Sequence, residues 1–97
     1  MNRSELLACL KLDSFIALDF ETTGLQVETD RPIEVAAILF KNGKPSERYA
    51  TLINPLIPIS DIIADITGIT NDMVTNAPKE SEMVDKLFDF LGNTPIV

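Results

Sequence analysis

Two acidic residues near the start of the chain, Asp19 and Glu21, have a spacing that could bind a metal ion. They stand in the stretch Asp-Phe-Glu-Thr-Thr-Gly-Leu, which ends at Leu25. Side chains on a β-strand alternate between its two faces, so acids separated by one residue point to the same face. Like charges this close repel each other unless a cation neutralises them, and carboxylate oxygens suit Mg2+ or Mn2+. The alternative is a solvated polar turn at a strand end, and a bare Asp-x-Glu pattern favours it.

Three segments have the composition of β-strands, and the first leads directly into the acidic pair. The predicted strands cover residues 15–20, 33–40 and 48–53. The Asn42-Gly43 pair between the last two suits a tight hairpin turn, because both residue types tolerate positive φ. Residues 33–40 are apolar for nearly their whole length, which predicts a central strand buried on both faces. The sequence therefore predicts a three-stranded antiparallel meander.

Helical patterns flank these strands. A short covering helix is predicted over 4–12, and a second runs from a cap at Ser60 to Gly68 with an isoleucine stripe along it. A further short turn is expected to begin at Thr70. The clearest pattern covers 79–91, where apolar residues recur at helical spacing.

The last three residues, 95–97, begin a new extended segment directly after that helix. We expect this segment to be the start of a fourth strand, and the chain to be a fragment of a larger sheet domain. Without further strands, residues 15–20 would form an open apolar edge. Exposed edge groups favour pairing with another chain, so a homodimer or higher assembly through this edge or its uncovered face is expected. The alternative is that the helix over 79–91 folds back over the opening and leaves the chain a monomer.

The composition limits the class of protein. The 97 residues, 45% of them apolar, suit one domain over 1–97 with its own core. The formal net charge of -7 opposes broad electrostatic capture of nucleic acid, but not action at one nucleic-acid end where bound cations reverse the local field. No apolar run approaches the roughly 20 residues of a membrane span and the N-terminus lacks a secretory pattern, so a cytoplasmic location is expected. The single cysteine, Cys9, is predicted to be a buried or half-buried thiol.

Residues 15–25 resemble the first metal-binding motif of the DEDD family of 3'-to-5' exonucleases, in particular the epsilon proofreading subunit of bacterial DNA polymerase III. The resemblance covers residues 14–97 as a whole. It continues through Arg-Pro-Ile-Glu-Val-Ala-Ala-Ile at 31–38, Ile-Asn-Pro at 53–55, Ile-Pro at 57–58 and Thr-Gly-Ile-Thr-Asn-Asp-Met-Val at 67–74. The order and spacing of these segments make the signal far more specific than a short pattern taken alone.

This resemblance implies a ribonuclease H-like α/β fold, truncated here to the three-stranded antiparallel meander with flanking helices. In the family, the acid equivalent to Asp19 bridges two metal ions, Mg2+ or Mn2+, and the acid equivalent to Glu21 binds one of them. The residues implied to lie at the terminal nucleotide are Thr22, Thr23, Gly24 and Thr67. Thr22 is equally well explained as a turn residue. Thr67 occupies a position where epsilon subunits often carry His, whereas the exonuclease domain of the Gram-positive replicative polymerase carries Thr.

The implied reaction is two-metal hydrolysis of the terminal phosphodiester, which releases nucleoside 5'-monophosphates from the 3' end of single-stranded DNA or another nucleic acid. A polymerase or helicase is the expected protein partner. The chain contains no histidine and ends before the second family motif, so it lacks the family's general base and its later acids. We therefore expect the isolated chain to be inactive. The alternative is a catalytically dead fold fragment that acts as a binding or dimerisation module.

Four other acids have structural explanations. By resemblance, Glu34 in the central strand is a structural acid that hydrogen-bonds the nearby loop. Asp61, Asp65 and Asp72 fit helix starts and solvated surface, where the helix dipole favours negative charge. None of the four is predicted to bind a metal.

Overall fold

The computed structural model describes residues 2–3 and 13–97. Its elements are, in chain order, β1 (Ser14–Thr22), β2 (Pro32–Lys41), β3 (Lys44–Leu52), α2 (Asp61–Thr67), α3 (Asn71–Val74) and α4 (Glu80–Leu91). The helix predicted over 4–12 and the predicted burial of Cys9 fall outside the described residues. Within the part that is described, no helix is both long and apolar enough to cross a membrane.

The three strands form one antiparallel sheet in the order β1-β2-β3. The meander and the central place of β2 are thereby confirmed. The turn between β2 and β3 uses Asn42 and Gly43, whose φ angles are 53° and 80°. Because this turn needs only two residues, β3 resumes at Lys44, four residues earlier than the sequence predicts.

Burial along β2 alternates, so the prediction that both faces are buried is correct for one face only. The buried residues are Ile33, Val35, Ala37 and Leu39. The residues between them are half-buried. The apolar run therefore does not mean two covered faces, because its even-numbered positions include Glu34 and the small Ala36.

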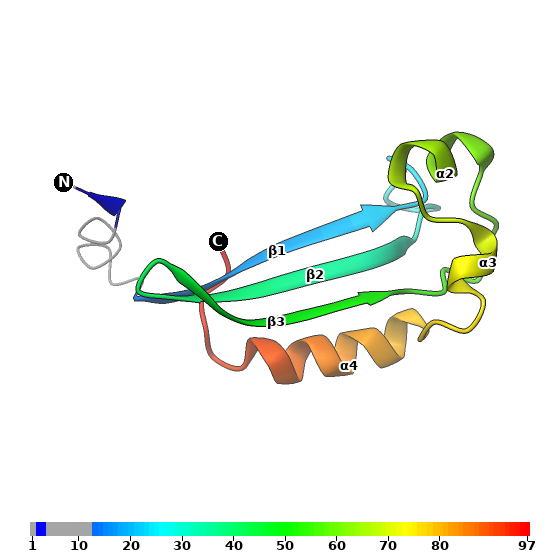
Figure 1. Cartoon of the computed structure of the whole chain (residues 1–97). Coiled ribbons are helices and arrows are strands. Elements are labelled where there is room, and N and C mark those ends of the chain that lie inside the picture. The colour runs from blue at the N-terminus through cyan, green and yellow to red at the C-terminus, as the bar shows by residue number, and fades with distance from the viewer. Residues whose placement is uncertain (1, 4–12) are drawn as a thin grey trace.

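The buried face of the sheet packs against α4, which runs beside β3 in Figure 1. Met83, Leu87 and Leu91 on α4 are buried against one face of the strands. Their partners in this cluster are Ile16, Val35, Ala37, Leu39 and Ile53. The predicted helix over 79–91 is confirmed. It ends at Gly92, whose N–H donates to the Phe88 carbonyl oxygen at 3.1 Å.

A second, smaller core holds α2 and α3 at one end of the sheet (Figure 1). It consists of Ile33, Ile59, Ile69 and Val74. The predicted cap of α2 is confirmed, because the Ser60 hydroxyl accepts a hydrogen bond from the Ile63 N–H at 3.2 Å. The helix ends as predicted at Gly68, whose φ is 76°. This end of the sheet is where β1 finishes, so the small core positions α2 beside the acidic motif.

The C-terminal residues pair with the outer edge of β1. The Ile16 N–H donates to the Pro95 carbonyl oxygen at 2.8 Å, and the Val97 N–H donates to the Ile16 carbonyl oxygen at 2.9 Å. This pairing is a single parallel bridge, which agrees with the predicted extended segment at 95–97 but does not form a fourth strand. The prediction that β1 is open along its whole length is therefore wrong at Ile16, because residues 95–97 fold back onto that position.

Candidate active site

Asp19 and Glu21 lie on the face of β1 that points away from α4. The register pairs Asp19 with Ala36 and Glu21 with Glu34, and directly paired residues share a face. Leu18, one position before Asp19, packs instead against the α4 core. Asp19 is exposed and Glu21 is half-buried. The predicted same-face placement of the two acids is therefore confirmed.

The strand pairing shifts by one residue immediately after Glu21. Glu21 pairs with Glu34, but Thr22 pairs with Pro32, which leaves Ile33 without a direct partner on β1. Such irregularities bend a strand and re-aim the side chains beside them, and they are frequent next to active sites. The Thr22 hydroxyl then donates to the Gly24 carbonyl oxygen at 2.6 Å and closes the end of the strand.

Asp30 organises the loop that follows. Its carboxylate accepts hydrogen bonds from the Thr23 hydroxyl at 2.8 Å and from the Gln26 N–H at 2.7 Å. The Thr23 hydroxyl also accepts from the Arg31 N–H at 3.0 Å, and the Thr23 N–H donates to the Arg31 carbonyl oxygen at 2.9 Å. These bonds give Thr23 a structural role in tying the two ends of the loop together.

Gly24 lies so close to the Asp30 carboxylate that only a residue without a side chain fits there. A Cβ added at Gly24 would stand 2.6 Å from one carboxylate oxygen of Asp30 and 2.9 Å from the other. No side chain fits in that space without moving the acid. The small residue therefore allows Asp30 to hold the loop close to the end of β1.

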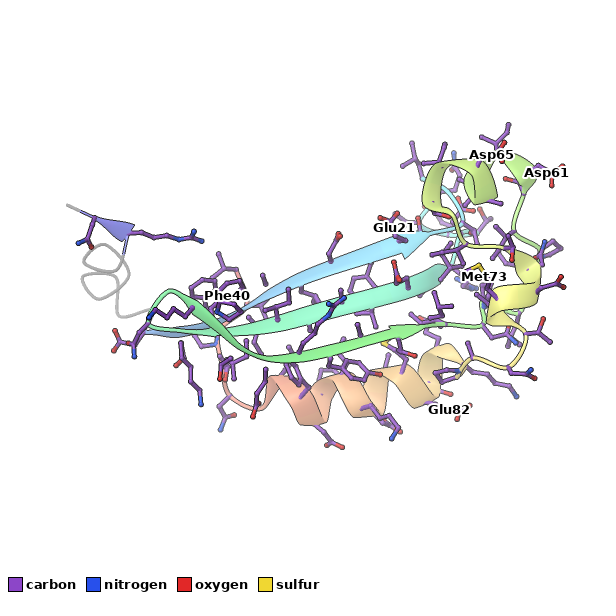
Figure 2. The ribbon with its side chains drawn as sticks, in the orientation of Figure 1. Glu21, Phe40, Asp61, Asp65, Met73 and Glu82 are labelled. Carbon is purple, nitrogen blue, oxygen red and sulfur yellow. The ribbon has the colours of Figure 1, made fainter. Side chains whose placement is uncertain are left out.

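A cleft of about 430 Å³ lies between the end of β1 and α2. It brings together residues that are far apart in the sequence, namely Phe20, Glu21, Thr22, Gly24, Leu25, Ile63, Ile66 and Thr67. Figure 2 shows Glu21 at the end of β1 close to α2, and Asp61 and Asp65 on the outer side of that helix. Of the six site residues predicted from the sequence, Glu21, Thr22, Gly24 and Thr67 line this cleft. Asp19 and Thr23 do not.

Thr67 is fixed at the C-terminal end of α2. Its hydroxyl donates to the Ile63 carbonyl oxygen at 2.8 Å and accepts from the Ile69 N–H at 3.1 Å. The side chain is half-buried. Thr67 thus forms part of the rigid wall of the cleft opposite Glu21 and Thr22.

The donor set fits a hard divalent cation, but only as part of a coordination sphere. Asp19 and Glu21 supply carboxylate oxygens on one face, and Mg2+ and Mn2+ prefer oxygen ligands. Among residues 2–3 and 13–97, no three acidic, histidine or cysteine side chains come together in a metal-binding group. Glu34, although paired with Glu21 in register, does not complete such a group.

Sequence reasoning missed three contributors to this region. Asp30 lies outside the acidic motif, which ends at Leu25, so its role in the loop is visible only from its hydrogen bonds. Phe20 and Leu25 supply apolar walls of the cleft, and their exposed fractions are 39% and 98%. Their position in the sequence could have indicated this role. Phe20 stands between Asp19 and Glu21, and Leu25 follows them, so both lie near the same end of β1 as the acids.

Comparison with known proteins supports this description. The family model described as Exonuclease (RNase T) matches residues 16–97. The DNA polymerase III PolC-type protein of Bacillus cereus is 38% identical over 85 residues, which are 88% of this chain and 6% of that protein. The chain thus spans a small fraction of the relatives' length.

Two solved structures share the fold. Exonuclease X in complex with 5' overhanging duplex DNA is 29% identical, with a TM-score of 0.67 over 75% of this chain and 42% of its own. A 3'-exonuclease described with 3'-end specific recognition of histone mRNA stem-loop is 26% identical, with a TM-score of 0.73 over 82% of this chain and 39% of its own. The sheet and its helices are thus of the ribonuclease H-like α/β type found in such exonucleases. With the family match extending from β1 to the end of the chain, this protein belongs to the exonuclease family.

Proposed function

We propose that this chain is the N-terminal, metal-binding part of a 3'-to-5' exonuclease that removes nucleotides from a DNA 3' end. The observation that carries this proposal is that Asp19 and Glu21 share one face of β1 and that Glu21 also lines a cleft walled by α2. The PolC-type relatives support a proofreading role beside a replicative polymerase more than the epsilon-type role that the sequence first suggested. A helicase-linked repair exonuclease is the alternative context. We propose that the protein acts in the cytoplasm, where a bacterial chromosome is replicated.

Each part of the site has a distinct task in this proposal. The carboxylates of Asp19 and Glu21 would hold Mg2+ or Mn2+. When bound, such cations supply an activated water and neutralise the charge of the scissile phosphate. The cleft residues Thr22, Gly24 and Thr67 would hold the terminal nucleotide, while Thr23 would keep the loop in place through Asp30.

The apolar walls of the cleft would receive the terminal base. Phe20, Leu25 and Ile66 offer apolar surface there, with Phe20 able to pack against a base by its ring. Aromatic side chains stack on bases of any sequence. This arrangement fits an enzyme that must accept all four terminal nucleotides.

The 97 residues contain no histidine, the side chain that usually serves as general base near neutral pH. We therefore propose that this chain by itself releases negligible nucleotide. Losing a general base costs about 10²- to 10⁴-fold in rate.

Homodimerisation through β1 is the weaker alternative. Apart from Ile16, no described residue outside β2 pairs with β1, so Leu18 and Phe20 leave their backbone groups on its outer edge. An antiparallel pairing of two copies through these residues would set Asp19 opposite an acid of the other copy. Directly opposed like charges destabilise a strand pair. Charge repulsion thus opposes the assembly unless a cation lies between the copies.

The test uses the longest product of the parent gene and a single-stranded DNA oligonucleotide labelled at its 5' end. With Mg2+ or Mn2+ we expect a ladder of products shortened from the 3' end, and the same substrate in RNA serves to compare the sugars. Asp19→Ala should slow the reaction by about 10²-fold or more, whereas Asp65→Ala, on the outer side of α2, should leave it unchanged. A ladder that persists undiminished in Asp19→Ala would exclude this site as the source of the activity.

A further inference from the structure

A second hollow lies at the end of the sheet, between the loop after β3 and α3. It has a volume of about 450 Å³ and is lined by Asn54, Leu56, Ile57, Pro58, Asn71, Val74 and Thr75. None of these residues lines the cleft beside Glu21. We refer to this hollow, defined by these seven residues, as the α3 groove.

Leu56 is held in an unusual conformation at the rim of the α3 groove. Its φ is 61°, in the left-handed region that favours glycine or asparagine. Its side chain is nevertheless 68% exposed. The Asn54 side chain fixes this geometry by accepting the Leu56 N–H at 2.9 Å. A surface position that combines backbone strain with an exposed large apolar side chain indicates a contact made by that side chain.

The polar lining of the α3 groove is already engaged in internal hydrogen bonds. Asn71 both accepts from the Ile59 N–H at 2.8 Å and donates to the Ile59 carbonyl oxygen at 3.0 Å. The Thr75 hydroxyl donates to the Asn71 carbonyl oxygen at 3.0 Å, and the Asn54 amide donates to the Thr75 carbonyl oxygen at 3.4 Å. The groove is therefore braced in shape, and its exposed apolar surface comes mainly from Leu56 and Ile57, whereas Val74 is buried beneath it. Such a surface selects an apolar group.

The charged residues around the α3 groove determine which sign of charge a partner must carry. Between Arg48 and Lys79 the sequence has no lysine or arginine, but it has Asp61, Asp65 and Asp72. Asp72 directly follows the lining residue Asn71, and all three acids are exposed. Lys79 pairs with Asn54 at one end of the groove, but Glu80 and Glu82 follow it. This surface repels phosphates and attracts cationic groups.

We propose that the α3 groove is a docking site for a polypeptide segment that carries a bulky apolar residue flanked by lysine or arginine. The apolar residue packs against Leu56 and Ile57, while the basic residues lie toward Asp72. This function is separate from nucleotide hydrolysis, because the groove shares no lining residue with the cleft. A protein that docks here could hold the exonuclease in an assembly without covering its site.

The experiment selects peptides from a random-sequence display library against the folded chain, and then measures their affinity by calorimetry. Enriched peptides should carry a leucine, isoleucine or aromatic residue between lysines or arginines. Leu56→Asn keeps a residue that tolerates positive φ but removes the apolar contact, so it should weaken binding by about tenfold or more while the unfolding midpoint stays equal or rises. Ile57→Asn is a second variant of the same wall, and Ile62→Asn, on exposed α2 outside the groove, is the control.

Charge is tested by a matched pair of variants. Asp72→Lys and Asp89→Lys alter the net charge equally, but only Asp72 adjoins the α3 groove, whereas Asp89 is on α4. Only Asp72→Lys should weaken the selected peptides by several-fold. Enrichment of peptides without basic residues, equal weakening by both lysine variants, or full binding to Leu56→Asn would each overturn the proposal. So would oligo(dT) binding that disappears in Leu56→Asn, because it would assign the groove to nucleic acid. In the longest product of the parent gene, DNA hydrolysis should be unaffected by Leu56→Asn, so the two sites can fail independently.

Discussion

Glu21 on β1 stands directly opposite Glu34 on β2, so a third acid shares the sheet face of Asp19 and Glu21. Opposed residues of an antiparallel pair have Cβ atoms about 4.5–5.5 Å apart. The hydrogen bonds that hold the nearby loop run through Thr23 and Asp30, so the bond predicted from Glu34 to that loop is not among them. The fold therefore maintains a local concentration of negative charge at the end of β1.

Replacing Glu34 with glutamine should stabilise the chain in the absence of divalent cations. Removing one of two opposed like charges contributes about 0.2–1 kcal/mol to the free energy of unfolding, and the gain should shrink as salt screens the pair. Urea unfolding at neutral pH, at low and at high ionic strength, measures both effects. Glu47→Gln on the outer strand β3 is the control, since Glu47 pairs with Leu39. Equal stability of Glu34→Gln and the parent chain at low salt would show that the pair does not repel.

Asp19 and Glu21 should bind Mn2+ weakly in this chain. Two carboxylates supply few of the roughly six oxygen ligands that such a cation takes. Calorimetric titration should detect this binding in the parent chain and lose it in Asp19→Asn and in Glu21→Gln. Asp65→Asn, an exposed acid on α2, should bind Mn2+ as the parent does. Unchanged affinity in both site variants would mean that the cation binds elsewhere.

Gly24→Ala should destabilise the loop between β1 and β2. The added methyl group would stand 2.6 Å from an oxygen of Asp30, and such overpacking typically costs about 1–3 kcal/mol. Thermal unfolding of Gly24→Ala, Asp30→Ala and the double variant would separate the clash from the loss of the Asp30 hydrogen bonds. We expect Gly24→Ala to have little further effect once Asp30 is alanine. Additive losses in the double variant would contradict the close contact.

Tyr49 should make the chain less stable in strong alkali. Desolvation by burial beside Phe90, whose ring centroid is 6.1 Å away, raises the pKa of Tyr49 above 10.0. The unfolded chain then ionises before the folded one, so this contribution to stability is complete below pH 10 and declines as pH rises through the folded pKa. The sequence has a single tyrosine, so ultraviolet titration reports it alone. A midpoint at or below that of the urea-unfolded chain would contradict the burial effect, and Tyr49→Phe should remove this part of the alkaline loss.

Local rules were sufficient for much of the fold. Side-chain alternation along a strand put Asp19 and Glu21 on one face, because that periodicity is independent of what the strand packs against. Asn42-Gly43 defined the hairpin, and Ser60 and Gly68 marked the limits of α2, since turns and caps depend on conformations available to a few adjacent residues. The resemblance of the same segments to an exonuclease motif, together with their order, was enough to indicate the family.

Other features were decided only by the tertiary structure. The register that opposes Glu21 and Glu34 runs unchanged from Ser14 to Glu21 and shifts only at Thr22. Neither strand's own sequence specifies this pairing with a distant segment. Thr67 reaches the cleft because the small core around Ile33 and Val74 packs α2 beside the end of β1. The contact between Gly24 and Asp30 likewise arises when the loop closes. These relationships depend on packing between segments far apart in sequence, whereas a local pattern constrains only its own neighbours.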